Sequence, residues 1–210
     1  MPSKQGTPGK KPEDPAHTKA DADGSAMNQE GMIRLKEMHL APFIQLATTL
    51  IGKRRHSGGN MFRHQIDTLG ILIDYGYLDS VLLKASLVHD IIEDVPDFNR
   101  DLLLDIDAES DEVYKLVLEV TKRTVETKAE FLMRILEYGS ARALVLKSAD
   151  RISNVISLGY VTDIAFIRRY TDETEKYLYP IAARANIAMH DELVELVKTR
   201  RDYLCRCFEI

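Results

Sequence analysis

The chain has 210 residues, of which 45% are hydrophobic and 29% charged, so it is long enough for one domain with its own core. This composition excludes a collagen, a disulfide scaffold and a wholly disordered chain. The formal net charge of −5 gives no overall attraction to nucleic acid or to an anionic membrane, and neither is expected as a partner. A phosphate-bearing ligand would therefore need a local cationic site. The oligomeric state is not readable from these numbers.

Residues 1–27 are expected to be a disordered tail, because they hold four of the seven prolines and almost no bulky apolar side chain. The tail lacks the apolar run of a secretory signal, and no segment reaches the roughly 18 consecutive apolar residues of a membrane span. The two cysteines, Cys205 and Cys207, form no disulfide framework, which favours a reducing compartment and a cytoplasmic location. Residues 28–210 are expected to form the single folded domain.

From residue 28 onward apolar residues recur at helical spacing and strand-like alternation is scarce. We therefore expect an all-α fold, a single compact bundle of many helices. The predicted helices cover, in chain order, residues 31–52, 61–75, 79–95, 110–122, 127–138, 140–158, 162–170, 172–187 and 190–207. Asn60 is expected to cap the second of these helices. Val95 should end the third, because the ring of Pro96 disfavours a helical conformation before it.

The segment 80–95 concentrates charge on one arc of its helical wheel. His89, Asp90, Glu93 and Asp94 share that arc, whereas the apolar residues fill another. A solvated face is the ordinary interpretation of such a pattern. However, three carboxylates and an imidazole crowd together here with no Lys or Arg four residues away, and like charges at this spacing repel. A divalent cation would relieve the repulsion, so a metal site is the alternative.

Two further segments carry polar groups in apolar surroundings. Within residues 142–158, Asp150 has Lys147 three residues before it and Asn154 four residues after it. A single aspartate on a helix is usually solvated, so this cluster favours a site only modestly. His64 follows the basic pair Arg54-Arg55, although one histidine in a helix is more often a packed or surface residue than a ligand. The cations available for a phosphate are Arg54, Arg55, Lys122, Lys147 and Arg151.

Taken in order, His64, His89-Asp90 and Asp150 form the H…HD…D signature of the HD metal-dependent phosphohydrolases. The segments ASLVHDIIEDV, VLKSADRISNVISL and RRHSGGNMFRH, together with Val120-Thr121-Lys122, resemble the hydrolase domain of the RelA/SpoT alarmone enzymes. The closing segment from residue 171 is similar to the end of that domain, so the resemblance covers about residues 40–205. The chain thus resembles the small HD-domain alarmone hydrolases, which occur in bacteria and metazoa.

The resemblance implies an all-α HD domain that hydrolyses the 3′-pyrophosphate of guanosine 3′,5′-bispyrophosphate (ppGpp or pppGpp), leaving GDP or GTP. It implies one Mn²⁺, held by the two imidazoles and two carboxylates of His64, His89, Asp90 and Asp150. Such a mixed nitrogen and oxygen set suits Mn²⁺, although zinc or iron would bind the same groups. Glu93 and Asp94 are implied to position and deprotonate the attacking water, and which of them is the base stays open.

By the same resemblance, the nucleotide is held by Arg55, Ser57, Lys147, Asn154, Ser157 and Leu158, with Arg55 lining the guanine pocket. Lys147 could instead be a structural partner of Asp150 or Asp94. The chain departs from the family where Gln65 replaces the proline after the first histidine. Departures of this kind bear on substrate preference. The alternatives are an HD phosphohydrolase for another nucleotide, such as the 2′-phosphate of NADPH, an antitoxin-like partner that neutralises an alarmone synthetase, and a plain helical scaffold.

Overall fold

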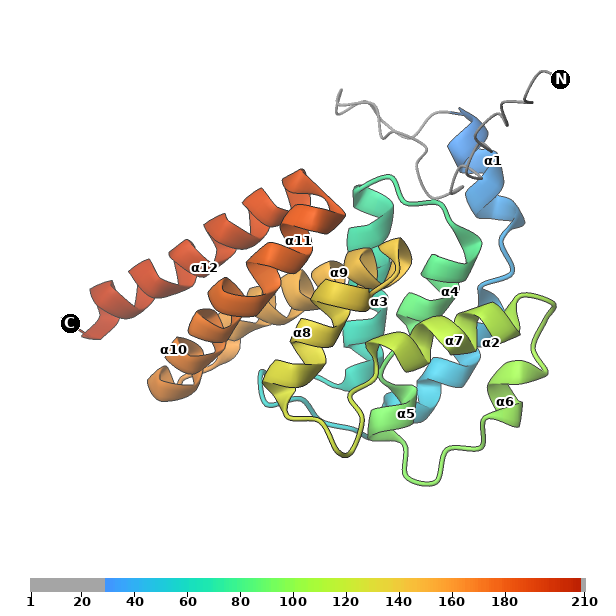
Figure 1. The fold of residues 1–210 in the computed structure, drawn as a ribbon, viewed down its shortest axis with the longest axis horizontal. Coiled ribbons are helices and arrows are strands. Elements are labelled where there is room, and N and C mark those ends of the chain that lie inside the picture. The colour runs from blue at the N-terminus through green and yellow to red at the C-terminus, as the bar shows by residue number, and fades with distance from the viewer. Residues whose placement is uncertain (1–28, 209–210) are drawn as a thin grey trace, which may run out of the picture.

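The computed structural model describes residues 29–208, so the predicted disordered tail over residues 1–27 lies outside the described residues. Within that range every regular element is helical, apart from an isolated bridge between Arg54 and Asn60, and the predicted all-α class is confirmed (Figure 1). The longer elements are α1 (Gln29–Glu37), α2 (Ala41–Ala47), α3 (Met61–Asp74), α4 (Ser80–Val88), α7 (Ser110–Val120), α8 (Lys128–Tyr138), α9 (Ala141–Ser157), α10 (Ile164–Glu173), α11 (Tyr179–Ala185) and α12 (Ile187–Phe208). The shorter ones are η1 (Thr48–Leu50), α5 (Ile91–Asp94), α6 (Asp101–Leu104), η2 (Leu158–Tyr160) and η3 (Thr174–Leu178).

Several predicted helices match these elements to within two residues, and two predicted boundaries are confirmed. Asn60 caps α3, because its side chain accepts a hydrogen bond from the Arg63 N–H at 3.0 Å. Val95 is extended, so the helical stretch ends before Pro96 as expected. The predicted helix 31–52 is wrong as one element. It divides into α1 and α2, and Pro42 lies in the first turn of α2, where its missing N–H is not needed.

The predicted helix 79–95 is also divided, at His89 and Asp90, into α4 and α5. Every residue of α4 after Ser80 is buried, so this helix has no solvated face. Helix α6 was not predicted, because four residues are too few to show a helical period. The interruption therefore places His89 and Asp90 at the end of a central helix rather than on the surface of a long one.

The predicted break between residues 170 and 172 is absent. Instead α10, η3 and α11 continue directly from Ile164 to Ala185, and η3 is a π-helical turn. Pro180, in the first turn of α11, cannot donate a hydrogen bond to the preceding turn. A wide π turn accommodates such a missing bond without ending the helix.

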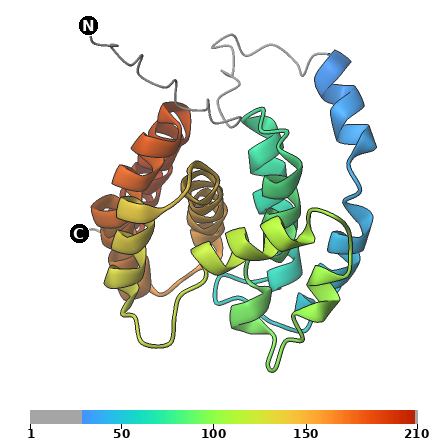
Figure 2. The same ribbon diagram turned by 45° about the vertical axis from the view of Figure 1, so that its right-hand side comes forward.

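Helices α9 and α4 form the centre of the bundle. Helix α9 packs against α3, α11 and α12, and α4 packs against α2, α3 and α7. Figure 2 shows the resulting division: α8 and α10–α12 lie on one side of α9, and α2–α7 lie on the other. Leu83 and Leu87 of α4 and Ile152 of α9 are fully buried and belong to one hydrophobic core. The facing surfaces of α3, α4 and α9 thus meet inside the molecule.

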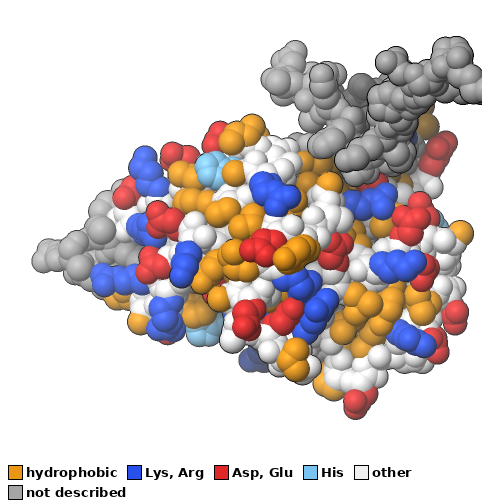
Figure 3. Space-filling model, in the orientation of Figure 1, with side chains coloured by type: hydrophobic (Ala, Val, Ile, Leu, Met, Phe, Trp, Pro, Cys, Tyr) orange, Lys and Arg blue, Asp and Glu red, His pale blue; other side chains and the backbone are white. Residues whose placement is uncertain are grey.

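The outer surface of the described part of the chain has a mixed character. Lys, Arg, Asp and Glu side chains are interspersed over the face that Figure 3 shows, in keeping with the small net charge. Among the described helices, none combines the length and the apolar character that crossing a bilayer would require.

A buried lysine ties α4 to the loop between α6 and α7. The Nζ atom of Lys84, whose residue is 4% exposed, donates to Asp107 Oδ2 at 2.6 Å and to Glu109 Oε2 at 2.5 Å. Burial on its own would lower the pKa of Lys84, but the two carboxylates outweigh it and raise the pKa. The lysine is therefore charged and depends on both acids for its compensation.

Replacing both acids, Asp107→Asn with Glu109→Gln, is expected to lower the free energy of unfolding by about 3–5 kcal/mol, because a buried ammonium group loses its counter-charges. Urea unfolding of the double variant at pH 7 measures this effect. The exposed pair of Lys115 and Asp111 offers a control, since Asp111→Asn should leave the urea midpoint close to that of the wild type.

The same variant should alter the response to acid. Partial burial would raise the pKa of Asp107, but the hydrogen bond from Lys84 more than offsets it and lowers the pKa, and Lys84 likewise lowers the pKa of Glu109. Their contribution is therefore complete above the unfolded pKa of about 4 and is lost as the pH falls through the lower folded values. The double variant should lose less stability than the wild type between about pH 5 and pH 2. Parallel curves would contradict this.

Candidate active site

Three segments far apart in the sequence bring their polar residues together. His64 lies in the second turn of α3, whose start is set by the Asn60 cap. His89 and Asp90 lie at the interruption between α4 and α5, and Asp150 lies in the middle of α9. Because α3 packs against both α4 and α9, these side chains meet in one place. His64, His89 and Asp150 are at most 5% exposed, and Asp90 is half-buried.

The two imidazoles face the two carboxylates through their Nε2 atoms. His64 Nε2 lies 3.0 Å from Asp150 Oδ1 and 3.6 Å from Asp90 Oδ2. His89 Nε2 lies 3.2 Å from Asp90 Oδ2 and 3.8 Å from Asp150 Oδ1. One ligand atom each from His64, His89 and Asp90 lie within 4.8 Å of one another. All four residues predicted as metal ligands thus converge on one small volume.

The hydrogen bonds on the other side of each ring test whether the cluster fits a metal. His89 Nδ1 donates to the Ser86 carbonyl oxygen at 2.8 Å, which leaves a bare lone pair on Nε2 of the neutral ring. That Nε2 atom is buried without a hydrogen-bond partner among the described residues, and it faces the Asp90 carboxylate. His64 Nδ1 is held by the Ser153 hydroxyl at 2.9 Å. In metal-binding histidines a hydrogen bond typically fixes one ring nitrogen while the other binds the metal, so these residues fit a cation.

The electrostatics of the cluster agree with this fit. Burial on its own would lower the pKa of His89, but Asp90 and Asp150 outweigh it and raise the pKa to about 9. Burial would likewise raise the pKa of Asp150, but Lys147 and the two imidazoles hold it well below its usual range. The Asp150 carboxylate thus stays ionised, and the surroundings of His89 favour a positive charge between the rings, whether a proton or a metal ion supplies it.

The Asp150 carboxylate is fixed by two residues of its own helix. Lys147 Nζ lies 2.8 Å from Oδ2, and Asn154 Nδ2 donates to Oδ1 at 2.5 Å. Lys147 is therefore the partner of Asp150, whereas Asp94 pairs with Lys53 at 3.0 Å. Lys147 could have paired with Asp150 or with Asp94, and the structure shows the pair with Asp150.

A cavity of about 310 Å³ opens beside the cluster. His64, Asp90 and Asp150 form part of its wall. Four cationic side chains from three different segments line it as well: Lys122, Lys128, Lys147 and Arg151. A cavity that His64, Asp90 and Asp150 share with four cationic side chains suits a phosphate group beside a metal ion.

A second cavity, of about 250 Å³, adjoins the first and shares Met61, Asn154 and Tyr170 with it. Of the six residues predicted to bind the nucleotide, four line the second cavity: Arg55, Ser57, Asn154 and Leu158. Ser157 lies behind Arg55, and Lys147 lines the first cavity instead. Five of the six residues therefore line the two adjoining cavities, and Ser157 contacts Arg55.

Arg55 is held in place by α9. Its Nη2 donates to Asn154 Oδ1 at 2.7 Å and its Nη1 donates to Ser157 Oγ at 3.1 Å. The loop that carries Arg55 turns at Gly58 and Gly59, whose φ angles of 88° and 73° would strain any side chain. The glycine turn and the two hydrogen bonds together present the guanidinium at the second cavity.

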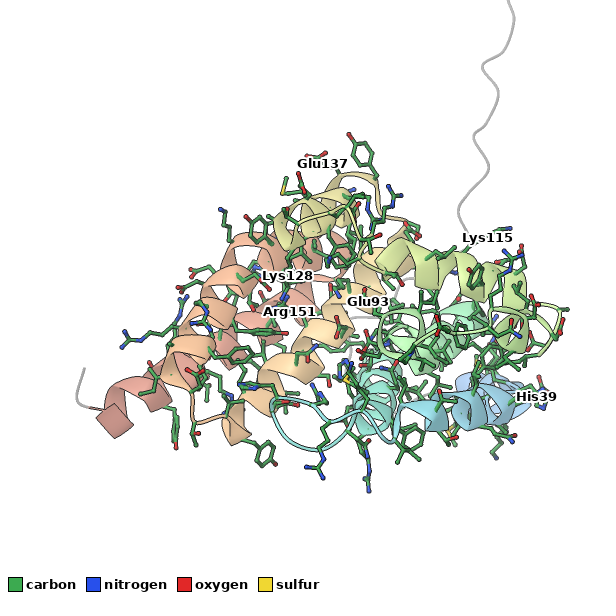
Figure 4. The ribbon with its side chains drawn as sticks, turned by 90° about the horizontal axis from the view of Figure 1, so that it is seen from below. His39, Glu93, Lys115, Lys128, Glu137 and Arg151 are labelled. Atoms are coloured by element: carbon green, nitrogen blue, oxygen red, sulfur yellow. The ribbon has the colours of Figure 1, made fainter. Side chains whose placement is uncertain are left out.

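The two acids proposed to act on water lie in different places. Glu93 lines the first cavity, and its Oε1 accepts a hydrogen bond from the Lys122 N–H at 2.6 Å. Asp94 lines the second cavity and is paired with Lys53. Figure 4 shows Glu93, Lys128 and Arg151 grouped near the middle of the molecule, away from His39, Lys115 and Glu137 at its edges. Only Glu93 of the two acids thus shares the space beside the four converging residues.

Sequence reasoning missed two residues with polar groups in the first cavity, Lys128 and Tyr170. Lys128 Nζ pairs with Glu173 at 2.9 Å and lies 5.3 Å from the centroid of the Tyr170 ring. The Arg151 guanidinium lies 4.2 Å from the same ring. These contacts join α8, α9 and α10, so the spacing of residues along the chain does not predict them. Arg151 had a signal, because it directly follows Asp150.

The chain was compared with families and proteins of known sequence. No protein-family model matches it. A guanosine-3′,5′-bis(diphosphate) 3′-pyrophosphohydrolase of Haemophilus influenzae is 30% identical over 152 residues, which are 69% of this chain and 22% of the relative. A GTP pyrophosphokinase rsh of Brucella ovis is 29% identical over 151 residues, 69% of this chain and 20% of the relative. The chain thus spans about a fifth of the length of these relatives.

A solved structure provides the comparison of fold. It is that of a metazoan orthologue of SpoT that hydrolyses ppGpp and plays a role in starvation responses. The TM-score is 0.62 at 22% sequence identity, and the match covers 84% of this chain and 98% of that chain. The chain shares the fold of this SpoT orthologue, and its predicted resemblance to the HD-type hydrolase domain of the RelA/SpoT proteins is confirmed.

Proposed function

We propose that the chain is a manganese-dependent phosphohydrolase that removes the 3′-pyrophosphate of ppGpp or pppGpp, leaving GDP or GTP. The observation that carries the proposal is the cluster of two imidazoles and two carboxylates beside a cavity that four cationic side chains line. Three of the four clustered residues, His64, Asp90 and Asp150, line that cavity as well. The names of the similar proteins support this substrate, because one relative is a pyrophosphohydrolase of the same nucleotide and the SpoT orthologue hydrolyses ppGpp.

In this proposal His64, His89, Asp90 and Asp150 hold one divalent cation. Two nitrogen and two carboxylate ligands suit Mn²⁺ and leave room for further oxygen ligands. When bound, the cation supplies Lewis acidity toward a phosphate oxygen and makes water easier to deprotonate.

The other residues of the first cavity act on the phosphate and on water. Glu93 takes a proton from the water that attacks the phosphorus attached to the ribose 3′-oxygen. The bond between that phosphorus and the 3′-oxygen breaks, the 3′-oxygen regains a proton, and pyrophosphate leaves. The cationic side chains balance the charge of the phosphates during the transfer: Lys122, Lys128, Lys147 and Arg151.

The second cavity takes the nucleoside. Arg55 offers a planar cation to the face of guanine, and the hydrogen bonds to Asn154 and Ser157 hold it in that orientation. Because the two cavities share residues, one nucleotide can place its base in the second and its 3′-phosphates in the first.

Incubating the purified protein with ppGpp and Mn²⁺ tests the proposal. We expect equal amounts of GDP and pyrophosphate, and no products when EDTA is present. A panel with NADPH, nucleoside monophosphates and deoxynucleoside triphosphates separates the alternatives in the same assay. Release of phosphate from NADPH with no turnover of ppGpp would assign the other substrate. Binding of ppGpp without turnover by folded, Mn²⁺-loaded protein would favour a neutralising partner instead.

A further inference from the structure

Gln65 is a buried amide next to the proposed metal ligands. It follows His64 on α3, its residue is 0% exposed, and its Nε2 donates to Asp90 Oδ2 at 2.9 Å. An ionised carboxylate only accepts hydrogen bonds, so the amide must turn its NH₂ group toward Asp90. The opposite atom, Oε1, is buried with no hydrogen-bond partner among the described residues. Burying an amide oxygen without a partner is unfavourable. The hydrogen bond to Asp90 is the polar contact that offsets part of this cost.

Each proposed metal ligand is held by identifiable neighbours, and the Asp90 carboxylate is held by Gln65. Asp150 is fixed by Lys147 and Asn154. The rings of His64 and His89 are fixed through their Nδ1 atoms. Asp90 lies at the interruption between α4 and α5 and its side chain is 21% exposed. Within the described part of the chain, Gln65 supplies the hydrogen bond that holds its carboxylate toward the two imidazoles.

We propose that Gln65 is a positioning residue that holds Asp90 Oδ2 between the two imidazole Nε2 atoms and thereby sets the affinity of the site for a divalent cation. The inference rests on the metal site of the proposed function. Without the amide, the Asp90 side chain can rotate toward solvent, and a cation would have to order it again on binding. Loss of such an outer hydrogen bond typically weakens metal binding by about 10–100-fold.

Gln65 lines neither cavity, so it touches neither the phosphates nor the base of a bound nucleotide. Replacing Gln65 should therefore change the affinity for the metal and not the affinity for the substrate. This separates a positioning role from a catalytic one.

The experiment measures Mn²⁺ binding to the metal-free full chain by the electron paramagnetic resonance signal of free Mn²⁺. Gln65→Met keeps the length of the side chain and removes the NH₂ group, and we expect its Kd for Mn²⁺ to rise by about 10–100-fold. In turnover of ppGpp, the Mn²⁺ concentration for half-maximal rate should rise by the same factor. The kcat and KM at saturating Mn²⁺ should stay within about threefold of the wild type.

Thr68→Val is the matched control. Thr68 is also fully buried on α3, and its hydroxyl donates to the His64 backbone oxygen at 2.9 Å without contacting Asp90. Its Kd for Mn²⁺ should stay within twofold of the wild type. If Gln65→Met does not fold, Gln65→Asn replaces it, because the shorter amide no longer reaches Asp90 and should weaken binding in the same direction.

Each outcome decides between the claims. Mn²⁺ binding within twofold of the wild type in a folded Gln65 variant overturns the inference and leaves the proposed function intact. Equal weakening in Thr68→Val overturns it as well, because general damage to α3 then explains the loss. A wild-type protein that binds no Mn²⁺ contradicts the manganese site of the proposed function, and the inference falls with it.

Discussion

Asp150→Asn should abolish Mn²⁺ binding and lower kcat/KM for ppGpp by roughly a thousandfold or more. The variant removes one negative ligand and leaves His64 and His89 facing a neutral amide. The Lewis acidity lost with the cation is worth several kcal/mol in the transition state, which corresponds to that factor in rate. Binding of Mn²⁺ and turnover of ppGpp, measured on the same sample, should disappear together. Wild-type Mn²⁺ binding in this variant would show that Asp150 is not a ligand.

The same variant should also be less stable, and this must be separated from the chemistry. Lys147 is half-buried, with a side chain 15% exposed, and it is paired with the Asp150 carboxylate, so the amide leaves its ammonium group without a counter-charge. Such a loss costs about 3–5 kcal/mol. The double variant Asp150→Asn with Lys147→Met removes the stranded charge and should recover most of that stability. Metal binding should stay lost in the double variant, because Lys147 supplies no ligand. Recovery of metal binding together with stability would instead attribute the loss to unfolding.

Glu93→Gln should keep the wild-type Kd for Mn²⁺ and lower kcat by roughly 10²–10⁴-fold, the range expected for a general base. The amide oxygen of glutamine can still accept the hydrogen bond from the Lys122 N–H, so the loop before α8 stays anchored. Only the ability to take a proton is removed. Stopped-flow or discontinuous assays at saturating Mn²⁺ and ppGpp measure kcat directly.

Asp94→Asn is the matched control for Glu93→Gln, because it makes the same chemical change one residue away. Asp94 is paired with Lys53 and lines the second cavity, away from the proposed metal ligands. We expect kcat to fall by less than about tenfold and any larger effect to appear in KM. If Asp94→Asn loses more kcat than Glu93→Gln, the roles of the two acids are reversed.

Much of the fold can be predicted from local patterns in the sequence. The helical period of the apolar residues predicts the all-α class, and Asn60 and Pro96 mark helix boundaries that the structure confirms. The predicted boundaries that are wrong belong to helices whose ends depend on packing against other helices. Helix α4 is buried on every side, so a helical wheel with one charged arc does not describe it. The run from α10 to α11 continues past an expected break because a π turn accommodates Pro180.

The candidate site divides in a similar way. The order His64, His89-Asp90 and Asp150 is visible in the chain, because residue type and spacing are enough to recognise a motif. The sequence does not show that Glu93 lines one cavity and Asp94 the other. Adjacent residues on a helix point in different directions, but which cavity each side chain reaches depends on the helices packed around them. Lys128 carries no local signal, and Gln65 is visible in the sequence only as a departure from the family pattern. Their roles come from the packing of α3, α8 and α9 around the interruption at Asp90, which brings together side chains that the sequence separates.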